Sequence, residues 1–550
     1  MFEIVDIDAL GRIGKLFVNN KQMITPNLFP VIHPFKNVVP ASDLKEIGAQ
    51  CLFTNAYIMY QNELKREKII KSGIHNHLQF DGLIATDSGA FQKYMYTNNQ
   101  IEINAEIIEK FQEDIGSDFP VILDIPVQLD DTHEQAKEKV NTTLSRAKDN
   151  VRRRSNKSCH WVGPIQGGKF LDLLNKSVNE MNSLDFEIYA IGGIVKAFLE
   201  YRFDLTTDIL LNVKKSIVPN KPIHMFGLGL PQYFSLAVAC GCDLMDSAAY
   251  ILFAKEGRYF TLSTGTEKLD ELEEFPCHCP ICCQYTPKEM KALGEDMRIE
   301  LLAKHNLYLS FSELRTIRQA IREGNLWELI EQRVRSHPSL VKALHVVNNN
   351  KTFIEASEKA YKKSGRLYIS SESISRPLIK RYDEKITSNY RIPKEAKFLI
   401  LLPELDTRGA NSPSILSWIS QINNTQLIPR ELLHVVFISD FYGVIPLELL
   451  DTFPLSQFES ITAIDNNDDL HQNSVRKALK FLNVNIQHYE KCGVLIPEMF
   501  LNQFNEIKKF SSKNPIHKIF SLLQAKYASK ISNFTNILYL LQYFRTDGMQ

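Results

Sequence analysis

The chain has 550 residues, with 64 Lys and Arg against 64 Asp and Glu, so its formal net charge is zero. This balance excludes a chain-wide electrostatic attraction to nucleic acid or to an anionic membrane, and any such partner must be held by local patches. A hydrophobic content of 44% and an aromatic content of 10% exclude disordered and low-complexity classes. At roughly 150 residues per domain, the length predicts two to four domains.

The N-terminal segment is not expected to be an export signal. Residues 1–20 lack a basic stretch followed by an uninterrupted apolar one. No window approaches the roughly 18 uninterrupted apolar residues of a membrane span. We therefore expect a cytoplasmic protein without a membrane partner, in which cysteines stay reduced.

Short apolar runs that end in polar or glycine residues alternate with helix-period stretches over residues 1–347. The runs are residues 51–57, 82–89, 120–126, 161–168, 187–193, 222–229, 242–248 and 258–262. The stretches between them, such as residues 130–154, are long enough for helical crossovers between parallel strands. About eight strands in this pattern predict an α/β fold with a (β/α)8, TIM-type barrel rather than an open doubly wound sheet.

Polar residues fall at the C-terminal ends of these runs. Asp87, Asp124 and Asp246 each close one run, as do Gln166 and the Gly192–Gly193 pair. In (β/α)8 barrels, the rim formed by the C-terminal strand ends carries the catalytic residues. Aspartate, glycine and glutamine after a strand can also be simple turn formers or helix caps. For the three aspartates together, we favour a functional site.

A cysteine cluster follows the expected barrel. Cys277, Cys279 and Cys282 form a C-x-C-x-x-C motif, and His305 follows Cys282 after 22 intervening residues. Three thiolates and one imidazole are the set that a closed tetrahedral structural Zn(II) site needs, so we expect one such ion per chain. The neighbouring Cys283 and His278 are alternative ligands, but Cys282 completes the motif and His305 begins a stretch expected to be helical. A fully ligated zinc has no open position to activate water, so catalysis must come from elsewhere.

The chain is expected to divide into three parts. Residues 1–347 form the catalytic barrel, with a zinc-binding subdomain at about residues 270–310. Residues 348–465 contain several β-rich runs and predict a smaller α+β accessory domain. Residues 466–550 are rich in Asn and Lys and are expected to be mainly helical.

Several motifs, in this order, resemble those of the tRNA-guanine transglycosylases. They are TDSGAFQ at 86–92, LDIP at 123–126, PIQGG at 164–168, YAIGG at 189–193, FGLGLPQ at 226–232 and CDLMDSAAY at 242–250, followed by the cysteine motif. The resemblance covers residues 1–347 and extends more weakly to about residue 460. The segment after Asp246 is similar to that of the archaeal branch of the family.

The resemblance implies an enzyme that exchanges guanine at position 15, in the D-arm of tRNA, for 7-cyano-7-deazaguanine in archaeosine biosynthesis. Its partners would be tRNA, guanine and the incoming base, and we expect a homodimer. Exchange without net hydrolysis calls for a covalent glycosyl-enzyme intermediate. By resemblance, Asp246 is the nucleophile and Asp87 the general acid and base, although the reverse assignment stays open.

The resemblance also implies a purine pocket. Asp124 would bind the Watson-Crick edge of the guanine. The other residues expected to bind or shape the substrate site are Gln166, Ala190, Gly192, Gly193, Ser88 and Phe91. Because a guanine inside folded tRNA cannot reach such a pocket, base flipping is implied.

Two basic stretches are candidates for contacting the tRNA backbone. They are residues 148–157 and the helix that carries Arg315, Arg318 and Arg322. Such stretches are also typical of solvated helix faces. No PUA domain, the RNA-binding module of many archaeal members, is recognisable in residues 466–550.

Three rival functions are compatible with parts of the sequence. A noncatalytic tRNA-binding subunit would not need the three rim aspartates. An archaeosine-forming paralogue is suggested by the accessory region, but it would leave the zinc motif and the aspartates unexplained. A bacterial-type enzyme that uses an aminomethyl base would be a substrate variant of the favoured function.

Overall fold

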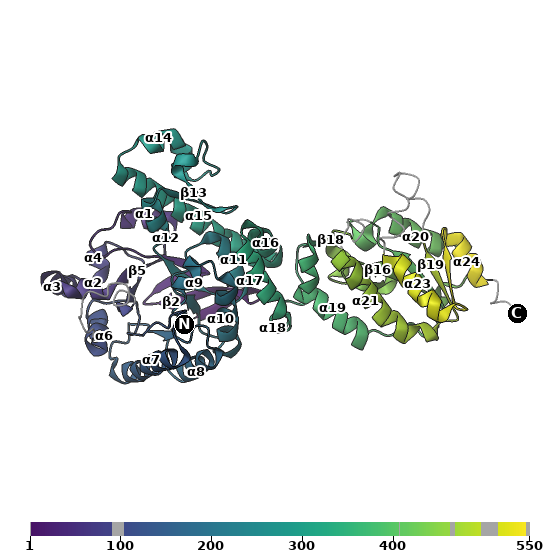
Figure 1. Cartoon of the computed structure of the whole chain (residues 1–550), viewed down its shortest axis with the longest axis horizontal. Coiled ribbons are helices and arrows are strands. Elements are labelled where there is room, and N and C mark those ends of the chain that lie inside the picture. The colour runs from purple at the N-terminus through teal and green to yellow at the C-terminus, as the bar shows by residue number, and fades with distance from the viewer. Residues whose placement is uncertain (1, 91–103, 406, 463–467, 497–514, 546–550) are drawn as a thin grey trace. The chain divides into compact units, whose positions relative to one another are not determined.

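A computed structural model describes residues 2–90, 104–405, 407–462, 468–496 and 515–545 of the chain (Figure 1). The chain divides into two compact units, Met1–Phe353 and Ile354–Gln550. The first unit therefore ends a few residues after the boundary expected at residue 347.

The first unit opens with a small antiparallel sheet that the sequence analysis did not predict. Its strands lie in the order β1-β2-β3 and are β1 (Phe2–Asp8), β2 (Gly11–Val18) and β3 (Lys21–Thr25). Leu16, Val18 and Met23 from this sheet are buried in one hydrophobic cluster with side chains of the parallel strands that follow. The sheet therefore belongs to the core of the first unit.

Two parallel sheets form the centre of the first unit, with strand orders β4-β11-β10-β9-β8 and β5-β6-β7. The strands are β4 (Asn27–Pro30), β5 (Cys51–Asn55), β6 (Leu83–Asp87), β7 (Phe119–Pro120), β8 (Val162–Ile165), β9 (Ile188–Ile191), β10 (Ile223–Met225) and β11 (Leu244–Ser247). Parallel bridges Val31↔Phe53 and Val121↔Val162 join the edges of the two sheets. The predicted α/β class with parallel strands is confirmed.

The prediction of one parallel strand is wrong. Residues 258–262 were expected to be the last member of the parallel set, but β12 (Arg258–Thr261) pairs antiparallel with β13 (Gly265–Lys268) in a separate hairpin. The strand missed by the sequence analysis is β4, which pairs parallel with β11. Its four residues, NLFP, are too short and too close to a proline to stand out as a strand.

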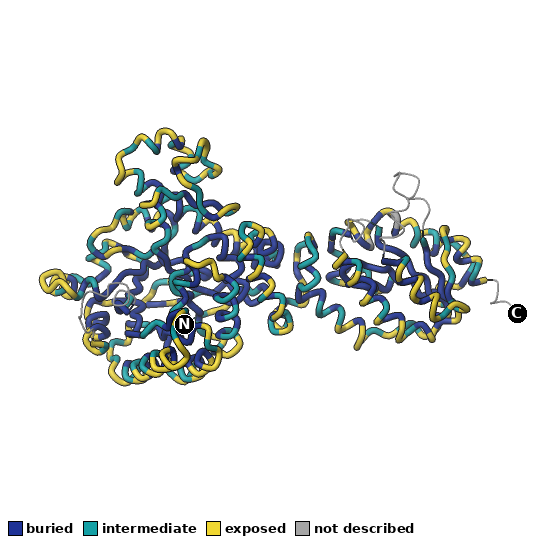
Figure 2. Tube along the Cα trace, in the orientation of Figure 1, coloured by how far each residue is buried: buried dark blue, intermediate teal, exposed yellow. Residues whose placement is uncertain are grey.

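Helices cover the parallel strands, and many of them alternate buried with exposed residues (Figure 2). In α7, Ala136, Val140, Leu144 and Ala147 are buried at helical spacing, and a capping box at Thr132 fixes its start. The described helices of the first unit are α1 (Ala41–Ile47), α2 (Ala56–Gln61), α3 (Glu63–Ser72), α4 (Ile74–Leu78), α6 (Ala105–Asp114), α7 (His133–Arg153), α8 (Leu171–Asn182), α9 (Val195–Leu199), α10 (Phe203–Ser216), α11 (Pro231–Ala239), α12 (Ala249–Lys255), α13 (Pro280–Gln284), α14 (Pro287–Ala292), α15 (Glu295–Glu323), α16 (Leu326–Arg333) and α17 (Pro338–Asn349). Helix α18 (Lys351–Glu355) spans the boundary between the two units in the sequence. Among the described residues, no helix combines the length and the apolarity needed to cross a membrane.

The second unit contains a five-stranded sheet in the order β17-β16-β15-β19-β20, in which only β17 is antiparallel to its neighbour. Its strands are β15 (Phe398–Pro403), β16 (Leu433–Ser439), β17 (Gly443–Pro446), β19 (Lys491–Leu495) and β20 (Ile531–Phe534), and a separate pair is β14 (Arg366–Tyr368) with β18 (Phe458–Ser460). The helices are α19 (Pro377–Ser388), α20 (Pro413–Asn424), α21 (Asp468–Asn485), α23 (Pro515–Tyr527) and α24 (Ile537–Arg545). A mainly parallel sheet with helical crossovers is α/β rather than the expected α+β.

The expected division at residue 466 does not match this sheet. Strands β19 and β20 lie in residues 466–550, yet β19 pairs directly with β15. One buried cluster contains side chains from both sides of the expected boundary. The segment looked helical because α21, α23 and α24 supply most of its described residues, and its two short strands are completed only by partners distant in sequence.

Candidate active site and metal cluster

The parallel strands bring the three rim aspartates to one edge. Asp87 is the last residue of β6, Asp246 lies near the end of β11, and Asp124 follows β7 by four residues. Because the C-terminal ends of parallel strands meet at the same edge, the three carboxylates face a common region. As a result, the negative charges of Asp124 and Asp246 both raise the pKa of Asp87.

Asp87 has an unusual proton affinity for a carboxylic acid. Burial and then the negative charge of Asp124 raise its pKa to about 7, against the opposing effects of two hydrogen bonds. One comes from the backbone N–H of Gly89, and in the other Asn55 Nδ2 donates to Asp87 Oδ2 at 2.8 Å. The Asn55 amide is itself fixed because its Oδ1 accepts from the N–H of Ile58 at the start of α2. An acid with a pKa near neutrality suits both proton donation and proton acceptance.

Asp124 and Gln166 form one buried unit. Gln166 Nε2 donates to Asp124 Oδ2 at 2.6 Å, and Gln166 Oε1 accepts from the N–H of Val127 at 3.0 Å. Burial raises the pKa of Asp124 to about 6, and the bond from Gln166 opposes this rise. Gln166 is fully buried, so its amide holds Asp124 in a single orientation.

Two glycine positions are required by close packing around this unit. A Cβ at Gly192 would lie 2.1 Å from Gln166 Nε2, and one at Gly193 would lie 2.3 Å from the carbonyl oxygen of Val127. Gly193 also has a φ of 74°, which disfavours other residues. The glycines therefore let the chain pack against the Gln166 amide, which is a narrower role than a general turn.

Asp246 has a partner that the sequence analysis missed. His224 Nε2 lies 2.9 Å from Asp246 Oδ1, and the N–H of Gly227 donates to the same oxygen at 3.2 Å. The His224 ring is almost fully buried and makes edge contacts with Phe29, Phe53 and Phe226. A histidine in the middle of the apolar run PIHMFGLG was the available signal.

Three further residues were expected to bind or shape the substrate site, namely Ser88, Ala190 and Phe91. Ser88 Oγ is buried and donates to the carbonyl oxygen of Ile122 at 3.1 Å, so it links two strand ends. Ala190 is fully buried in the hydrophobic cluster inside the parallel strands, so only its backbone is available to a site at the rim. Phe91 lies outside the described residues.

Parts of the two basic stretches proposed for tRNA contact are engaged in the fold, whereas Lys157, Arg315 and Arg322 are exposed. In residues 148–157, Lys148 lies 2.6 Å from Glu180 and Arg153 lies 2.7 Å from Glu109. This stretch ends α7 and leads into β8, so it lies at the edge opposite to the aspartates. Arg318 donates to the carbonyl oxygen of Pro26, which precedes β4, and is therefore committed to the same opposite edge.

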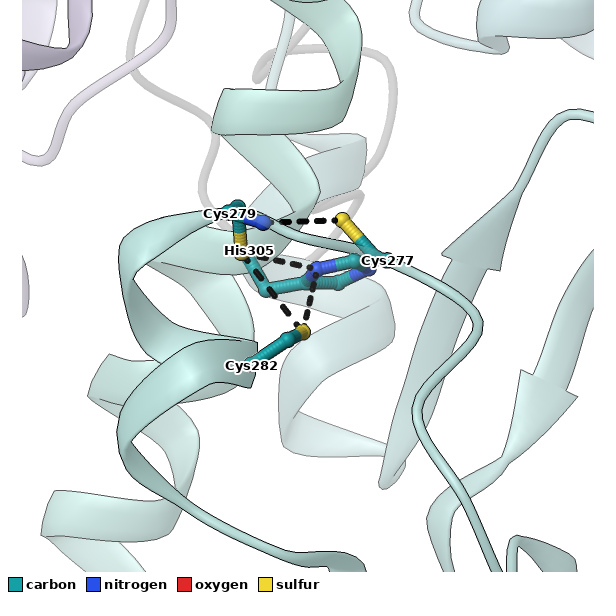
Figure 3. Close-up of side chains that lie close together, drawn as sticks. All are labelled: Cys277, Cys279, Cys282 and His305. Atoms are coloured by element: carbon teal, nitrogen blue, oxygen red, sulfur yellow. Dashed lines mark hydrogen bonds between the residues drawn. The ribbon is translucent and has the colours of Figure 1, made fainter.

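The predicted metal ligands come together from three segments (Figure 3). Cys277 lies in a loop, Cys279 and Cys282 lie at the start and within the first turn of α13, and His305 projects from α15. Their ligand atoms all lie within 4.8 Å of one another. His305 Nδ1 is 3.5 Å from Cys279 Sγ and 3.4 Å from Cys282 Sγ, and the two sulfurs are 3.5 Å apart.

These distances fit the tetrahedral coordination of a metal ion. Bond lengths of about 2.3 Å to sulfur and about 2.0 Å to nitrogen place neighbouring ligand atoms about 3.5 to 3.8 Å apart. His305 Nε2 lies 3.1 Å from the carbonyl oxygen of Phe260, which can accept its proton and leave Nδ1 free to bind metal. Tyr259 stacks on the imidazole at 3.6 Å and holds its plane. The cluster can therefore hold a metal ion, with Cys282 among its ligand residues. The exposed Cys283 is not part of the cluster.

Comparison with known proteins agrees with this site. The family model described as queuine tRNA-ribosyltransferase matches residues 7–339. The chain belongs to this family. All the candidate site residues and metal ligands of this transferase lie within the matched segment.

Similar proteins extend the match beyond the first unit. A protein of Methanococcus vannielii named tRNA-guanine(15) transglycosylase is 38% identical over 543 residues, which cover 96% of this chain and 79% of the relative. Proteins of the same name from Methanocaldococcus jannaschii and Methanobrevibacter smithii are 38% and 40% identical. The first of these two matches covers 96% of this chain and 79% of the relative, and the second covers 84% and 69%.

Proposed function

We propose that this member of the family is a tRNA-guanine(15) transglycosylase, which replaces guanine in tRNA by 7-cyano-7-deazaguanine on the route to archaeosine. The observation that carries the proposal is the trio of carboxylates at one edge, with the pKa of Asp87 raised to about 7 and Asp246 held by His224 and Gly227. The names of the similar proteins support the same activity.

We further propose that the eight parallel strands close into a (β/α)8 barrel. Two bridges support closure, because each joins an edge strand of one sheet to an edge strand of the other. The hydrophobic cluster that takes side chains from both sheets also supports it, since the interior of such a barrel is filled by inward-facing residues.

In the proposed reaction, the Asp246 carboxylate attacks C1′ of the flipped nucleotide and the bond between C1′ and the guanine breaks. Asp87 donates its proton to the leaving guanine. The incoming base then gives its ring N–H proton to Asp87 while its nitrogen attacks C1′, and Asp246 is released as a carboxylate. Each displacement forms one bond to C1′ and breaks another, and Asp87 gives up one proton and regains one. Because each displacement inverts C1′, the two together retain its configuration.

Recognition of the base is assigned to Asp124. Its carboxylate can accept two hydrogen bonds from the N–H groups of a guanine or 7-deazaguanine edge. One oxygen already accepts from Gln166, which fixes the plane of the carboxylate for this purpose. Gly192 and Gly193 leave room for the Gln166 amide that holds Asp124, and in the proposal their backbone also lines the base pocket. Ser88 supports the turn after Asp87.

The metal cluster suits a structural Zn(II), one per chain, with three cysteines and one histidine as ligands. When bound, such an ion links the loop of Cys277 and helix α13 to helix α15 and supplies no reactive position. The catalytic residues therefore act through their own carboxylates.

The deciding experiment is incorporation of labelled guanine into unmodified tRNA by the full chain, followed by competition with 7-cyano-7-deazaguanine. Incorporation with loss of label on adding the competitor supports the proposal. Absence of incorporation would leave the noncatalytic subunit or the archaeosine-forming paralogue as the better function. A homodimer and a cytoplasmic location stay predictions.

The release of guanine should depend on pH through Asp87. As its acid form donates the proton, the single-turnover rate of guanine release should fall as pH rises through about 7. In Asp124→Asn, a negative charge that raises the pKa of Asp87 is lost, so the midpoint should move to lower pH. The measurement is release of labelled guanine from saturating tRNA between pH 5 and 9. A flat profile, or an unchanged midpoint in the variant, would contradict this role.

Gln166→Leu should weaken base binding more than chemistry. Removal of the 2.6 Å bond to Asp124 frees the carboxylate to rotate. A hydrogen bond to a charged group contributes about 1.5–3 kcal/mol, so the KM for guanine should rise about tenfold to a hundredfold. Gln112, also buried and bonded to Thr86 and to a backbone carbonyl, offers a control. Gln112→Leu should lower stability and leave this KM unchanged.

A further inference from the structure

A group of cationic side chains lies beside the proposed active site. Lys36 is in the loop after β4, Lys65 is in α3, and Lys255 ends α12, and all three are exposed. Their charges converge on His33, whose pKa is lowered by burial and then by Lys36, Lys255 and Lys65. We call these three lysines around His33 the basic surface.

The strand register places this surface on the catalytic edge. In the pairing of β4 with β11, Phe29 lies opposite Asp246 and Pro30 opposite Ser247. The N–H of Val31 then donates to the carbonyl oxygen of Ser247. Chain emerging after Val31 therefore passes over the end of β11, next to the proposed nucleophile.

The segment that follows Val31 also contacts strand β5, whose Asn55 is hydrogen-bonded to Asp87. The N–H of Ile32 donates to the carbonyl oxygen of Phe53 in β5 at 2.8 Å. Asn55, two residues further along β5, donates to Asp87. The loop of His33 and Lys36 thus begins at the ends of β11, which carries Asp246, and of β5, whose Asn55 donates to Asp87.

The loop is held in shape before any ligand binds. His33 Nδ1 accepts from the N–H groups of Phe35 and Lys36, each at 3.1 Å. Lys65 Nζ lies 4.0 Å from the centre of the Phe35 ring, and the His77 ring contacts the same phenyl group edge-on. Such contacts lower the conformational entropy that a ligand would otherwise remove on binding.

The charges of the basic surface are not neutralised within the part of the chain that the structure describes. No ion pair there includes Lys36, Lys65 or Lys255, whereas other surface lysines have acidic partners at short distance, as Lys45 has with Asp81 at 2.6 Å. Although the net charge of the chain is zero, three unpaired lysines around one loop create a positive potential there.

We propose that the basic surface binds the phosphate backbone of the substrate tRNA beside the flipped nucleotide. This inference rests on the proposed function, because it takes the nucleotide at Asp246 as its reference point. Extruding one nucleotide draws its flanking phosphates to the rim of the pocket. Lysines whose charges are free to pair with those phosphates lie at that rim. The basic stretch at residues 148–157 lies at the opposite edge, and its Lys148 and Arg153 are paired with acids.

The test uses the full chain with Lys36, Lys65 and Lys255 all changed to Gln. Binding of unmodified tRNA is measured from 50 to 300 mM salt, alongside kcat and both KM values for exchange. Each phosphate contact contributes roughly 0.7–0.9 to the slope of log K against log salt. We expect the slope to fall by about 2 and the KM for tRNA to rise at least about tenfold. The KM for guanine and kcat at saturating tRNA should stay unchanged.

A matched control removes three cations from the opposite edge. Arg152, Lys157 and Lys215 are exposed and lie in segments that precede β8 and β10. Changing these three to Gln should leave the slope and the KM for tRNA close to wild type. Equal losses in both triple variants, or no loss in the first, would overturn the inference. Failure of the wild-type protein to incorporate guanine would instead overturn the proposed function, and the binding slopes would still compare the two surfaces.

Discussion

Asp246→Ala should abolish base exchange and, with it, the covalent adduct between protein and tRNA. The other two rim carboxylates do not replace the proposed nucleophile, since Asp87 ends a different strand and Asp124 lies in the segment after β7. Removal of a catalytic nucleophile typically lowers kcat by a factor of about 10⁴ or more. The measurements are incorporation of labelled guanine and trapping of the adduct on a denaturing gel.

An isosteric variant separates chemistry from packing. Asp246→Asn keeps the volume next to His224 and the contact with the N–H of Gly227, so its melting temperature should stay near that of wild type. It should nevertheless form no adduct. Asp87→Asn should still form the adduct slowly, because it lacks only the acid that assists departure of guanine. Adduct formation by Asp246→Asn together with none by Asp87→Asn would reverse the two roles.

Cys282→Ser should lose the metal and much of the stability of the first unit. The four ligands connect α13, its preceding loop and α15, so the bound ion contributes directly to folding free energy. A loss of several kcal/mol corresponds to a fall in Tm on the order of 10 °C. The measurements are zinc content per chain and thermal unfolding, and a strong chelator should reproduce the shift in wild type.

The neighbouring cysteine provides the control for this prediction. Cys283 is exposed and stands outside the group of ligand atoms. Cys283→Ser should therefore keep one zinc per chain and the wild-type Tm. Retention of metal in Cys282→Ser with loss in Cys283→Ser would show that the ligand set is wrong.

The candidate site was largely predictable because its residues follow local rules. Asp87, Asp124 and Asp246 each terminate an apolar run, and parallel strands carry such ends to one edge whatever the details of packing. The cysteine motif was equally readable, since its three sulfurs come from one short stretch. His224 was overlooked because a histidine within an apolar strand is usually a core residue, and only the register between β10 and β11 brings it to Asp246.

The errors arose where the residues of a strand do not reveal its pairing partner, whether that partner is near or distant in sequence. The run at residues 258–262 looks like any short strand, and its partner β13 decides that it belongs to a hairpin. Strand β4 has no periodic signal, and it is a strand because β11 lies beside it. In the second unit, β19 and β20 were hidden among helices for the same reason.

Length, composition and motifs by themselves indicated the α/β class and the family resemblance, and they predicted which cysteines, histidine and aspartates form the candidate sites. These depend on residue type, spacing and periodicity, which are written along the chain. The tertiary structure alone decided which strands are neighbours, which charges are paired and which are left over. Zero net charge concealed the basic surface, because the three lysines around His33 come from three separate segments and gather only when the strands pair.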